Sequence, residues 1–129
     1  MAVRIVRLGS PRGKGEGLRI GAVRRPPRGV PKAEFASRDF YDVWLPTLSP
    51  SPELFTKARA AKHDARLWNA FVRRFKAEMK TPGAGHVLDL LAALSRTADF
   101  SLGCYCTDER CHRFVLQSLL RERGARMAP

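Results

Sequence analysis

The segment FSLGCYC, residues 100–106, is the feature that most limits how this chain can fold. Its composition is typical of a β-strand, and it lies between two segments with helical patterns. Further strand-like segments occur near the N-terminus. The resulting order is strand, strand, extended segment, three helices, strand and helix. This order favours an α/β fold, with a small and mostly parallel sheet covered by helices.

The N-terminal part of the chain carries the other candidate strands. Residues 3–8 (VRIVRL) and 18–23 (LRIGAV) are short and rich in β-branched side chains, and glycine or proline follows each run soon after. Residues 9–17 between them are expected to form a flexible glycine-rich loop, because they lack the Gly-Lys-Ser/Thr ending of a phosphate-binding loop. Residues 39–48 alternate well enough to predict a short extended segment, with Trp44 helping to anchor the core.

Four segments have helical patterns. A Ser-Pro-Glu start predicts a helix over residues 52–61. Residues 66–80 combine one apolar stripe with a basic opposite face, and residues 87–94 are apolar nearly all round, which predicts a well-buried helix. The last helix is expected at about residues 109–123. The apolar stripe consists of Leu67, Phe71, Phe75 and Met79.

The length of the chain limits the number of domains. At 129 residues, 44% of them hydrophobic, it can form one domain with its own core but not two of ordinary size. We expect residues 1–129 to form a single α/β domain, with residues 124–129 as a disordered tail. No stretch approaches the roughly 18 apolar residues of a membrane-spanning helix, and the N-terminus lacks the apolar run of a signal peptide. These features predict a cytoplasmic protein without a membrane partner.

The three cysteines lie within residues 104–111, and none occurs elsewhere. Cysteines so close together cannot link distant parts of a fold, and an odd number leaves one unpaired. Such usage is typical of a reducing compartment. Chemistry at the thiols is therefore favoured over cross-linking.

Positive charge is concentrated in the first quarter of the chain. The net charge is +12, and nine of the 24 Lys and Arg residues fall in residues 1–32, where Glu16 is the single acidic residue. Such an excess attracts anions, either small phosphate-bearing molecules, nucleic acid or an acidic protein. Three of the cations, Arg24, Arg25 and Arg28, follow the second predicted strand. A solvated basic surface without a partner is the alternative interpretation.

The turn from the late strand into the last helix carries the most chemistry. With Thr107 or Asp108 as the helix cap, Cys111 falls in the first turn, where free N–H groups and the helix dipole favour a thiolate. Helical periodicity points His112 toward the sheet and places Arg113 at the rim, where it can bind a phosphate or carboxylate. His112 is then either a base near the thiols or a structural buried histidine.

Four interpretations of this cluster stay open. The first is a thiolate site, with Cys104 or Cys111 as a nucleophile or redox pair and Arg113 binding an oxyanion. The second is a zinc site at Cys104, Cys106 and Cys111, with His112 as a further donor. The third is non-catalytic binding of an anion or nucleic acid. The fourth is inert packing of small buried side chains.

The spacing of the cluster differs from that of cysteine phosphatases and sulfurtransferases, which place five residues between a cysteine and an arginine. Five residues after Cys106 lead to His112, and Arg113 comes one position too late. The sequence therefore does not support membership of that class.

Several motifs occur in a characteristic order along the chain. They are AVRRPPRG at residues 22–29, WLPTLSPSPEL at 44–54, W-x2-F-x3-F at 68–75, and a strand ending Cys-Tyr before a helix that opens CHR at 111–113. In this order they resemble the YeaO-like family, domain of unknown function 488, in its cysteine-bearing (CHR) branch. The resemblance implies an α/β domain and no established reaction.

Two departures from the family pattern affect the candidate site. Family members read close to VDRLWPRG at the first motif, so the acidic residue and the tryptophan are missing here. Members of the cysteine-bearing branch read C-Y-E before CHR, which maps onto Cys104 and Tyr105 and leaves Cys106 in the acidic position. The resemblance therefore implies roles for Cys104 and the CHR residues but none for Cys106.

Together these features predict a site at the carboxyl end of the late strand, where α/β folds place their ligands. The catalytic candidates are Cys104, Cys111, His112 and Arg113. The anion-binding candidates are Arg24, Arg28 and Arg113. The expected ligand is a small oxyanion or phosphorylated molecule, and nucleic acid is the alternative partner. No cofactor is predicted, with zinc at the cysteines as the alternative.

Overall fold

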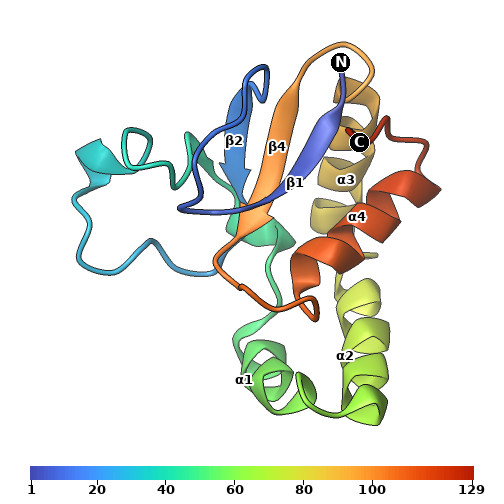
Figure 1. The fold of residues 1–129 in the computed structure, drawn as a ribbon. Helices are drawn as coiled ribbons and strands as arrows, with labels where there is room; N and C mark the ends of the chain where they lie inside the picture. The colour runs from blue at the N-terminus through green and yellow to red at the C-terminus, as the bar shows by residue number, and fades with distance from the viewer.

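Four strands pair into one parallel sheet, and four α-helices pack around it (Figure 1). The strands are β1 Val3–Arg7, β2 Leu18–Gly21, β3 Val43–Trp44 and β4 Phe100–Cys104, and the helices are α1 Pro52–Ala61, α2 Ala65–Glu78, α3 Pro82–Leu94 and α4 His112–Glu122. The computed structural model describes every residue from 1 to 129. In space the strands follow the order β1-β4-β2-β3. The α/β fold predicted from the sequence is confirmed.

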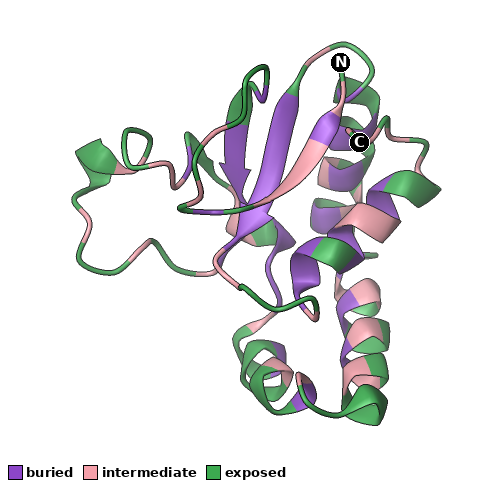
Figure 2. Cartoon of the chain, viewed as in Figure 1, coloured by how far each residue is buried: buried purple, intermediate pink, exposed green.

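The central strand of the sheet is β4, although it is the last strand along the chain. It pairs in parallel with β1, where Arg7 lies opposite Cys104, and with β2, where Gly21 lies opposite Gly103. All five of its residues are buried (Figure 2). Because parallel strands end at the same edge of a sheet, Cys104 lies beside the points where the chain leaves β1 and β2.

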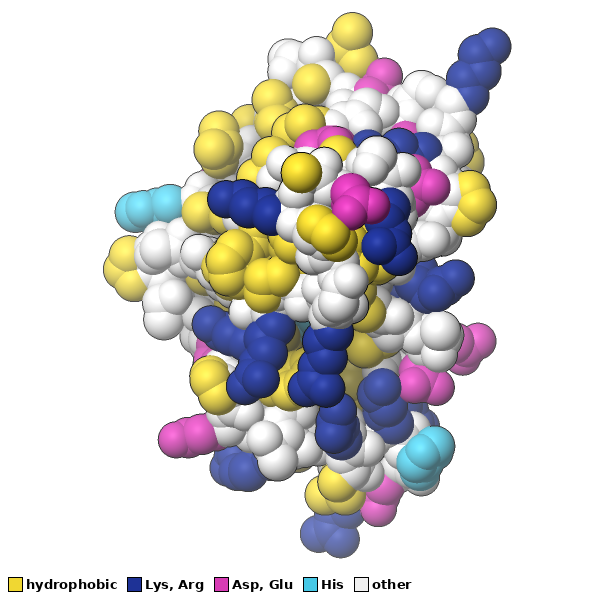
Figure 3. Space-filling view, turned by 90° about the vertical axis from the view of Figure 1, so that its left-hand side faces the viewer, with side chains coloured by type: hydrophobic (Ala, Val, Ile, Leu, Met, Phe, Trp, Pro, Cys, Tyr) yellow, Lys and Arg dark blue, Asp and Glu magenta, His cyan; other side chains and the backbone are white.

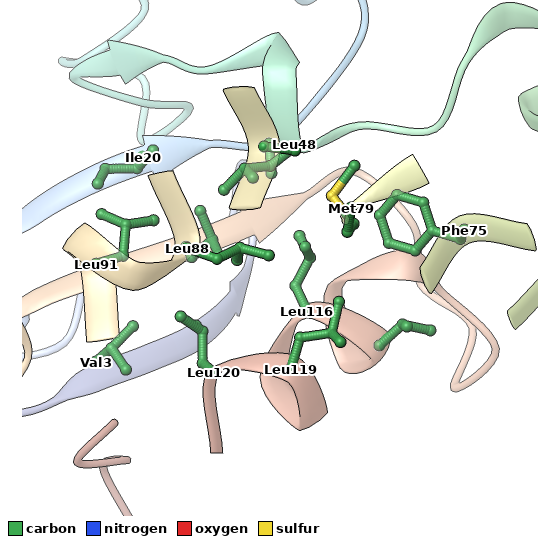
Figure 4. Close-up of a cluster of buried hydrophobic side chains, with 14 of the residues drawn as sticks. Val3, Ile20, Leu48, Phe75, Met79, Leu88, Leu91, Leu116, Leu119 and Leu120 are labelled. Carbon is green, nitrogen blue, oxygen red and sulfur yellow. The ribbon is translucent and has the colours of Figure 1, made fainter. Parts of the chain in front are cut away.

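One face of the sheet is covered by helices. Phe100 and Leu102 of β4 join Val3 of β1 in a core of 19 buried residues, most of which come from the helices. The close-up in Figure 4 shows leucines of α3 and α4 packed among strand side chains. Full burial of each such side chain contributes about 1.5–3 kcal/mol. Phe75 and Met79, at the predicted four-residue spacing, extend this core toward α2.

A buried ion pair covers the opposite face. Arg19 is fully buried and donates hydrogen bonds to both carboxylate oxygens of Glu16, at 2.7 and 2.9 Å. Arg19 also donates to the carbonyl of Asp39 at 2.7 Å, and the Ser101 hydroxyl donates to Glu16 at 2.8 Å. Since Ser101 belongs to β4, the pair fastens the loop of residues 9–17 to the central strand.

Some apolar side chains are more exposed than their sequence patterns predict. Leu90 and Leu94 of α3 are 63% and 37% exposed, because the sheet and α4 cover this helix from one side. Trp44 is 44% exposed on the edge strand β3, and its indole N–H donates to the Val23 carbonyl at 2.7 Å. These apolar surfaces do not amount to a membrane span, since every helix is too short or too polar to cross a bilayer.

The C-terminal residues differ from the disordered tail expected at 124–129. The Val3 N–H donates to the Arg126 carbonyl and the Ala128 N–H donates to the Val3 carbonyl, each at 2.9 Å. Val3 and Met127 form an isolated parallel bridge. The physical reason is that β1 is an edge strand, whose unpaired backbone groups can bind another extended segment.

Replacing Glu16 by Gln should destabilise the fold by about 3–5 kcal/mol, because the variant leaves the buried Arg19 guanidinium without its counter-charge. Burial by itself would raise the pKa of Glu16, but hydrogen bonds from Arg19, Ser101 and the Gly13 N–H outweigh it and lower this pKa from 4.5 to about 2. The stability that the pair supplies is therefore complete above pH 4.5 and is lost as the pH falls toward 2. Urea unfolding at several pH values measures both effects.

The control for this variant is Glu34→Gln, which changes an exposed glutamate. Its free energy of unfolding should stay within about 0.5 kcal/mol of the wild-type value. The pair has no stabilising role if Glu16→Gln is as stable as Glu34→Gln and keeps the acid sensitivity of the wild type.

Candidate functional site

The three cysteines meet where β4 ends and α4 begins. Cys104 is the last residue of β4, and Cys111 is the N-cap of α4, so the loop of residues 105–110 returns the chain to the same place. Cys104 and Cys111 are buried, Cys106 is partly exposed, and all three thiols are free. The two buried cysteines pack in a small second core with Leu8, Val23 and Tyr41.

Helix α4 begins about three residues later than its sequence pattern predicts. The expected caps were Thr107 and Asp108, but Cys111 takes the cap position with an extended backbone, φ −139° and ψ 145°. Asp108 pairs instead with Lys62 at 3.0 Å, and Arg110 donates to the Lys62 carbonyl at 2.9 Å. These contacts with the end of α1 hold the loop out of the helix.

His112 is buried and faces the sheet, as the helical periodicity predicts. Its Nε2 lies 2.6 Å from the Ala22 carbonyl, an acceptor, so Nε2 carries the proton in the neutral ring. Nδ1 is then left with a free lone pair, 3.9 Å from Cys111 Sγ. Burial lowers the pKa of His112, although the bond to Ala22 opposes this shift. The site therefore contains a neutral imidazole whose open nitrogen faces a thiol.

Arg113 is buried instead of lying at the rim, where the sequence places it. Its Nη1 donates to the Cys106 carbonyl and lies 3.7 Å from Cys104 Sγ. The guanidinium carbon also lies 4.7 Å from the centre of the Phe114 ring. Arg113 thus fixes the backbone at Cys106, and this position differs from the oxyanion-binding position predicted for it.

The three thiols differ in acidity because they share hydrogen bonds. Hydrogen bonding with Cys104 and Cys111 lowers the pKa of Cys106 well below the usual thiol range despite its partial burial. Lys62 and His112 lower this pKa further. Hydrogen bonding with Cys104 and Cys106, together with burial, raises the pKa of Cys111, and hydrogen bonding with Cys106 raises the pKa of Cys104. Cys106 is therefore the thiol that ionises first.

A cavity of about 300 Å³ opens beside the cysteines, between the loop and the helices α1 and α2. Cys106, Cys111 and His112 form part of its wall. Three cations and one carboxylate also line it, namely Arg59, Lys62, Arg110 and Asp108. Lys and Arg side chains gather beside apolar ones in the lower half of the view in Figure 3. The most acidic thiol, that of Cys106, therefore lines the same cavity as an excess of positively charged side chains.

The chain matches the family described as the active DUF488-N3 subclade over residues 3–124. It belongs to this family. The resemblance to domain of unknown function 488, drawn from the sequence motifs, is thereby confirmed. No curated protein and no solved structure matches the chain.

Two arginines of the first DUF488 motif do not line the cavity. Arg24 donates to the carbonyl of Pro50 at 2.7 Å and to that of Ser49 at 3.3 Å, so its guanidinium fastens the segment before α1. Arg28 is exposed in the turn that follows β2. The structure therefore does not bring these predicted anion-binding residues to the wall beside the cysteines.

Two of the cations that line the cavity, Arg59 and Lys62, were missed by sequence reasoning. Arg59 and Lys62 are three residues apart, a spacing that places two side chains on one face of a helix. This signal was visible, but nothing in the sequence shows that the end of α1 meets the cysteine loop. Arg110 lies within the predicted motif, and its bond to the Lys62 carbonyl carries it to the same cavity.

The DUF488 site also contains a group of residues that could hold a metal ion. The ligand atoms of Cys104, Cys111 and His112 all lie within 4.8 Å of one another, and all three residues are buried. Thiolate and imidazole are the donors that Zn²⁺ prefers in structural sites. Zinc therefore fits this donor set, which keeps Cys104 and Cys111 of the zinc site predicted from the sequence and has His112 in place of Cys106.

The imidazole of His112 should titrate below its ordinary pKa of 6.5, because burial disfavours the charged ring. This group then contributes stability that is present above pH 6.5 and is lost as the pH falls below it. Nitrogen-15 NMR measures both the titration midpoint and the tautomer, and the exposed His63 and His86 supply reference signals. A midpoint above 6.5 would show that burial does not dominate the titration, and a proton on Nδ1 would show that the Ala22 bond does not set the tautomer.

Proposed function

We propose that this DUF488 domain is a thiol-dependent protein that binds a small oxyanion or phosphorylated ligand in the cavity, with Cys106 as its reactive thiolate. The observation that carries the proposal is the position of Cys106, the most acidic of three clustered thiols, in a cavity that also presents three cations. The thiolate is the nucleophilic form of cysteine, so a lowered pKa supplies the reactive species at neutral pH.

Three cations support the binding of an anion next to Cys106. Arg59 has no acidic partner, and Arg110 uses one N–H on the Lys62 carbonyl, which leaves its other donors for a ligand. The hydrogen bond with Asp108 raises the pKa of Lys62, so this ammonium group stays charged. Guanidinium groups bind phosphate and carboxylate oxygens through paired N–H donors. The cavity therefore favours a ligand with negative charge.

The neighbouring residues set the state of Cys106. Cys104 and Cys111 supply S–H donors, and Arg113 holds the Cys106 backbone through its carbonyl. His112 presents an unprotonated Nδ1 to the thiols and can accept a proton from them. This assignment reverses the ranking drawn from the sequence, in which Cys104 and Cys111 were the candidate nucleophiles and Cys106 had no role.

Alkylation by iodoacetamide should modify Cys106 first, with an apparent pKa below about 7, because its thiolate is stabilised by two S–H donors and by Lys62. Mass spectrometry after short exposures across a range of pH locates the modified residue and yields its rate. The double variant Cys104→Ala and Cys111→Ala is expected to shift the rate profile to higher pH, since alanine cannot donate a hydrogen bond to the Cys106 thiolate.

The matched control is Cys106→Ser, which should leave the two buried thiols at least tenfold slower to alkylate than Cys106 is in the wild type. If all three cysteines of the wild type alkylate with the profile of a free thiol, near pH 8.5, the thiolate proposal is wrong.

A zinc site is the second candidate, favoured by the hydrogen bond of His112. Metal-binding histidines usually donate their other N–H to a carbonyl or carboxylate, and the bond from Nε2 to Ala22 is of this kind. It leaves Nδ1 facing the thiols. Cys104, Cys111 and His112 would be three protein ligands of the ion, and Cys106 lies outside this group.

On this second proposal, elemental analysis of the purified protein should give about one zinc ion per chain, since Cys104, Cys111 and His112 together form one site. His112→Gln should weaken zinc binding by roughly tenfold or more, measured by competition with a chelator. Zinc-free protein whose Cys106 is alkylated at pH 7 favours the thiolate proposal, whereas protein that carries one zinc ion per chain and loses it in His112→Gln favours the metal site.

A further inference from the structure

The cavity beside Cys106 has an aromatic wall as well as a basic one. Phe55 of α1 and Trp68 of α2 line it together with Tyr105 of the loop. Trp68 stacks on Phe71, with ring centres 4.9 Å apart and planes 21° apart. Phe55 is 43% exposed, so a large apolar ring is left in water at the cavity. An aromatic or heterocyclic ligand would cover these rings.

The charges that line the cavity indicate that its ligand is also negatively charged. Its cations are Arg59, Lys62 and Arg110, and Asp108 is the single carboxylate that lines it. Asp108 is already paired with Lys62 at 3.0 Å. The two guanidinium groups thus face the cavity without a carboxylate of their own, and a phosphate group is the anion that their paired donors fit.

We propose that the cavity binds a nucleoside phosphate, with the base on the aromatic wall and the phosphate on Arg59 and Arg110, next to Cys106. This inference rests on the proposed function and names the ligand class of the same site. Inorganic phosphate would leave the rings in water, and an uncharged ring compound would leave the guanidinium groups unpaired. A volume of about 300 Å³ lies at the small end of ligand pockets, which suits a single nucleotide.

Isothermal titration calorimetry with four probes tests the ligand class: AMP, adenosine, ribose 5-phosphate and inorganic phosphate. AMP should bind at least tenfold more tightly than each of the other three, because it alone joins a ring to a phosphate. GMP and CMP should bind within about tenfold of AMP, since every base has a face that stacks. Equal affinities for AMP and ribose 5-phosphate would overturn the proposal.

Two variants test the aromatic wall and the basic wall of the cavity separately. Phe55→Ala should weaken AMP about fivefold or more and leave ribose 5-phosphate unchanged, because it removes a stacking surface. Arg59→Ala should weaken AMP and ribose 5-phosphate and leave adenosine unchanged. Both residues are exposed, so the variants should fold. The controls are Leu90→Ala and Arg73→Ala, which change exposed residues outside the cavity, and a loss in them as large as in the test variants would overturn the proposal.

Failure of this inference can be told apart from failure of the proposed function. AMP binding is also measured in Cys106→Ser, so that the affinity for AMP is known in the absence of the Cys106 thiol. Saturating AMP should slow alkylation of Cys106 in the wild type by at least tenfold, since the phosphate covers the sulfur. AMP that binds without slowing alkylation lies elsewhere and overturns the inference alone. A Cys106 with the reactivity of a free thiol overturns the proposed function and leaves the AMP affinities standing.

Discussion

The two-sided pairing of β4 is the constraint on which the other features depend. Phe100 and Leu102 point from this strand into the helical core, and Ser101, between them, donates to the buried carboxylate of Glu16. Both layers of the fold are therefore assembled against one strand. Because β4 lies between β1 and β2, its carboxyl end carries Cys104 into the interior, and the loop that follows must turn beneath the end of α1 to reach α4.

The acidity of Cys106 follows from the way that this loop is held. Burial alone would raise the pKa of all three thiols, since it disfavours the charged form. Two neighbouring S–H donors reverse this effect for the thiol that is partly open to solvent, and Lys62 adds to the change. The fixed carbonyl of Cys106, bound by the buried Arg113, keeps the three sulfur atoms together. In the proposed function, Cys104 and Cys111 therefore support the thiolate of Cys106.

The cavity combines parts of the chain that are far apart in the sequence. Its thiol wall and the ring of Tyr105 belong to the loop after β4, whereas its other rings and two of its cations belong to α1, α2 and their junction. The ion pair between Lys62 and Asp108 and the bond from Arg110 join these parts. This junction explains why a site built on a cysteine motif is also basic and aromatic, and it gives the proposed nucleoside phosphate two distinct surfaces to bind.

Local patterns in the sequence were enough to predict the element order, the parallel sheet and the helix over residues 52–61, whose observed bounds are the same. They also predicted the inward direction of His112, since helical periodicity needs no distant partner. Local patterns could not predict where α4 starts or which groups Arg24 and Arg113 bind. They also could not predict that Cys106 is the most acidic of the three thiols. Each depends on a contact across the fold, with Lys62, Pro50, the Cys106 carbonyl or the neighbouring sulfur atoms, and such contacts exist only after β4 has brought these segments together.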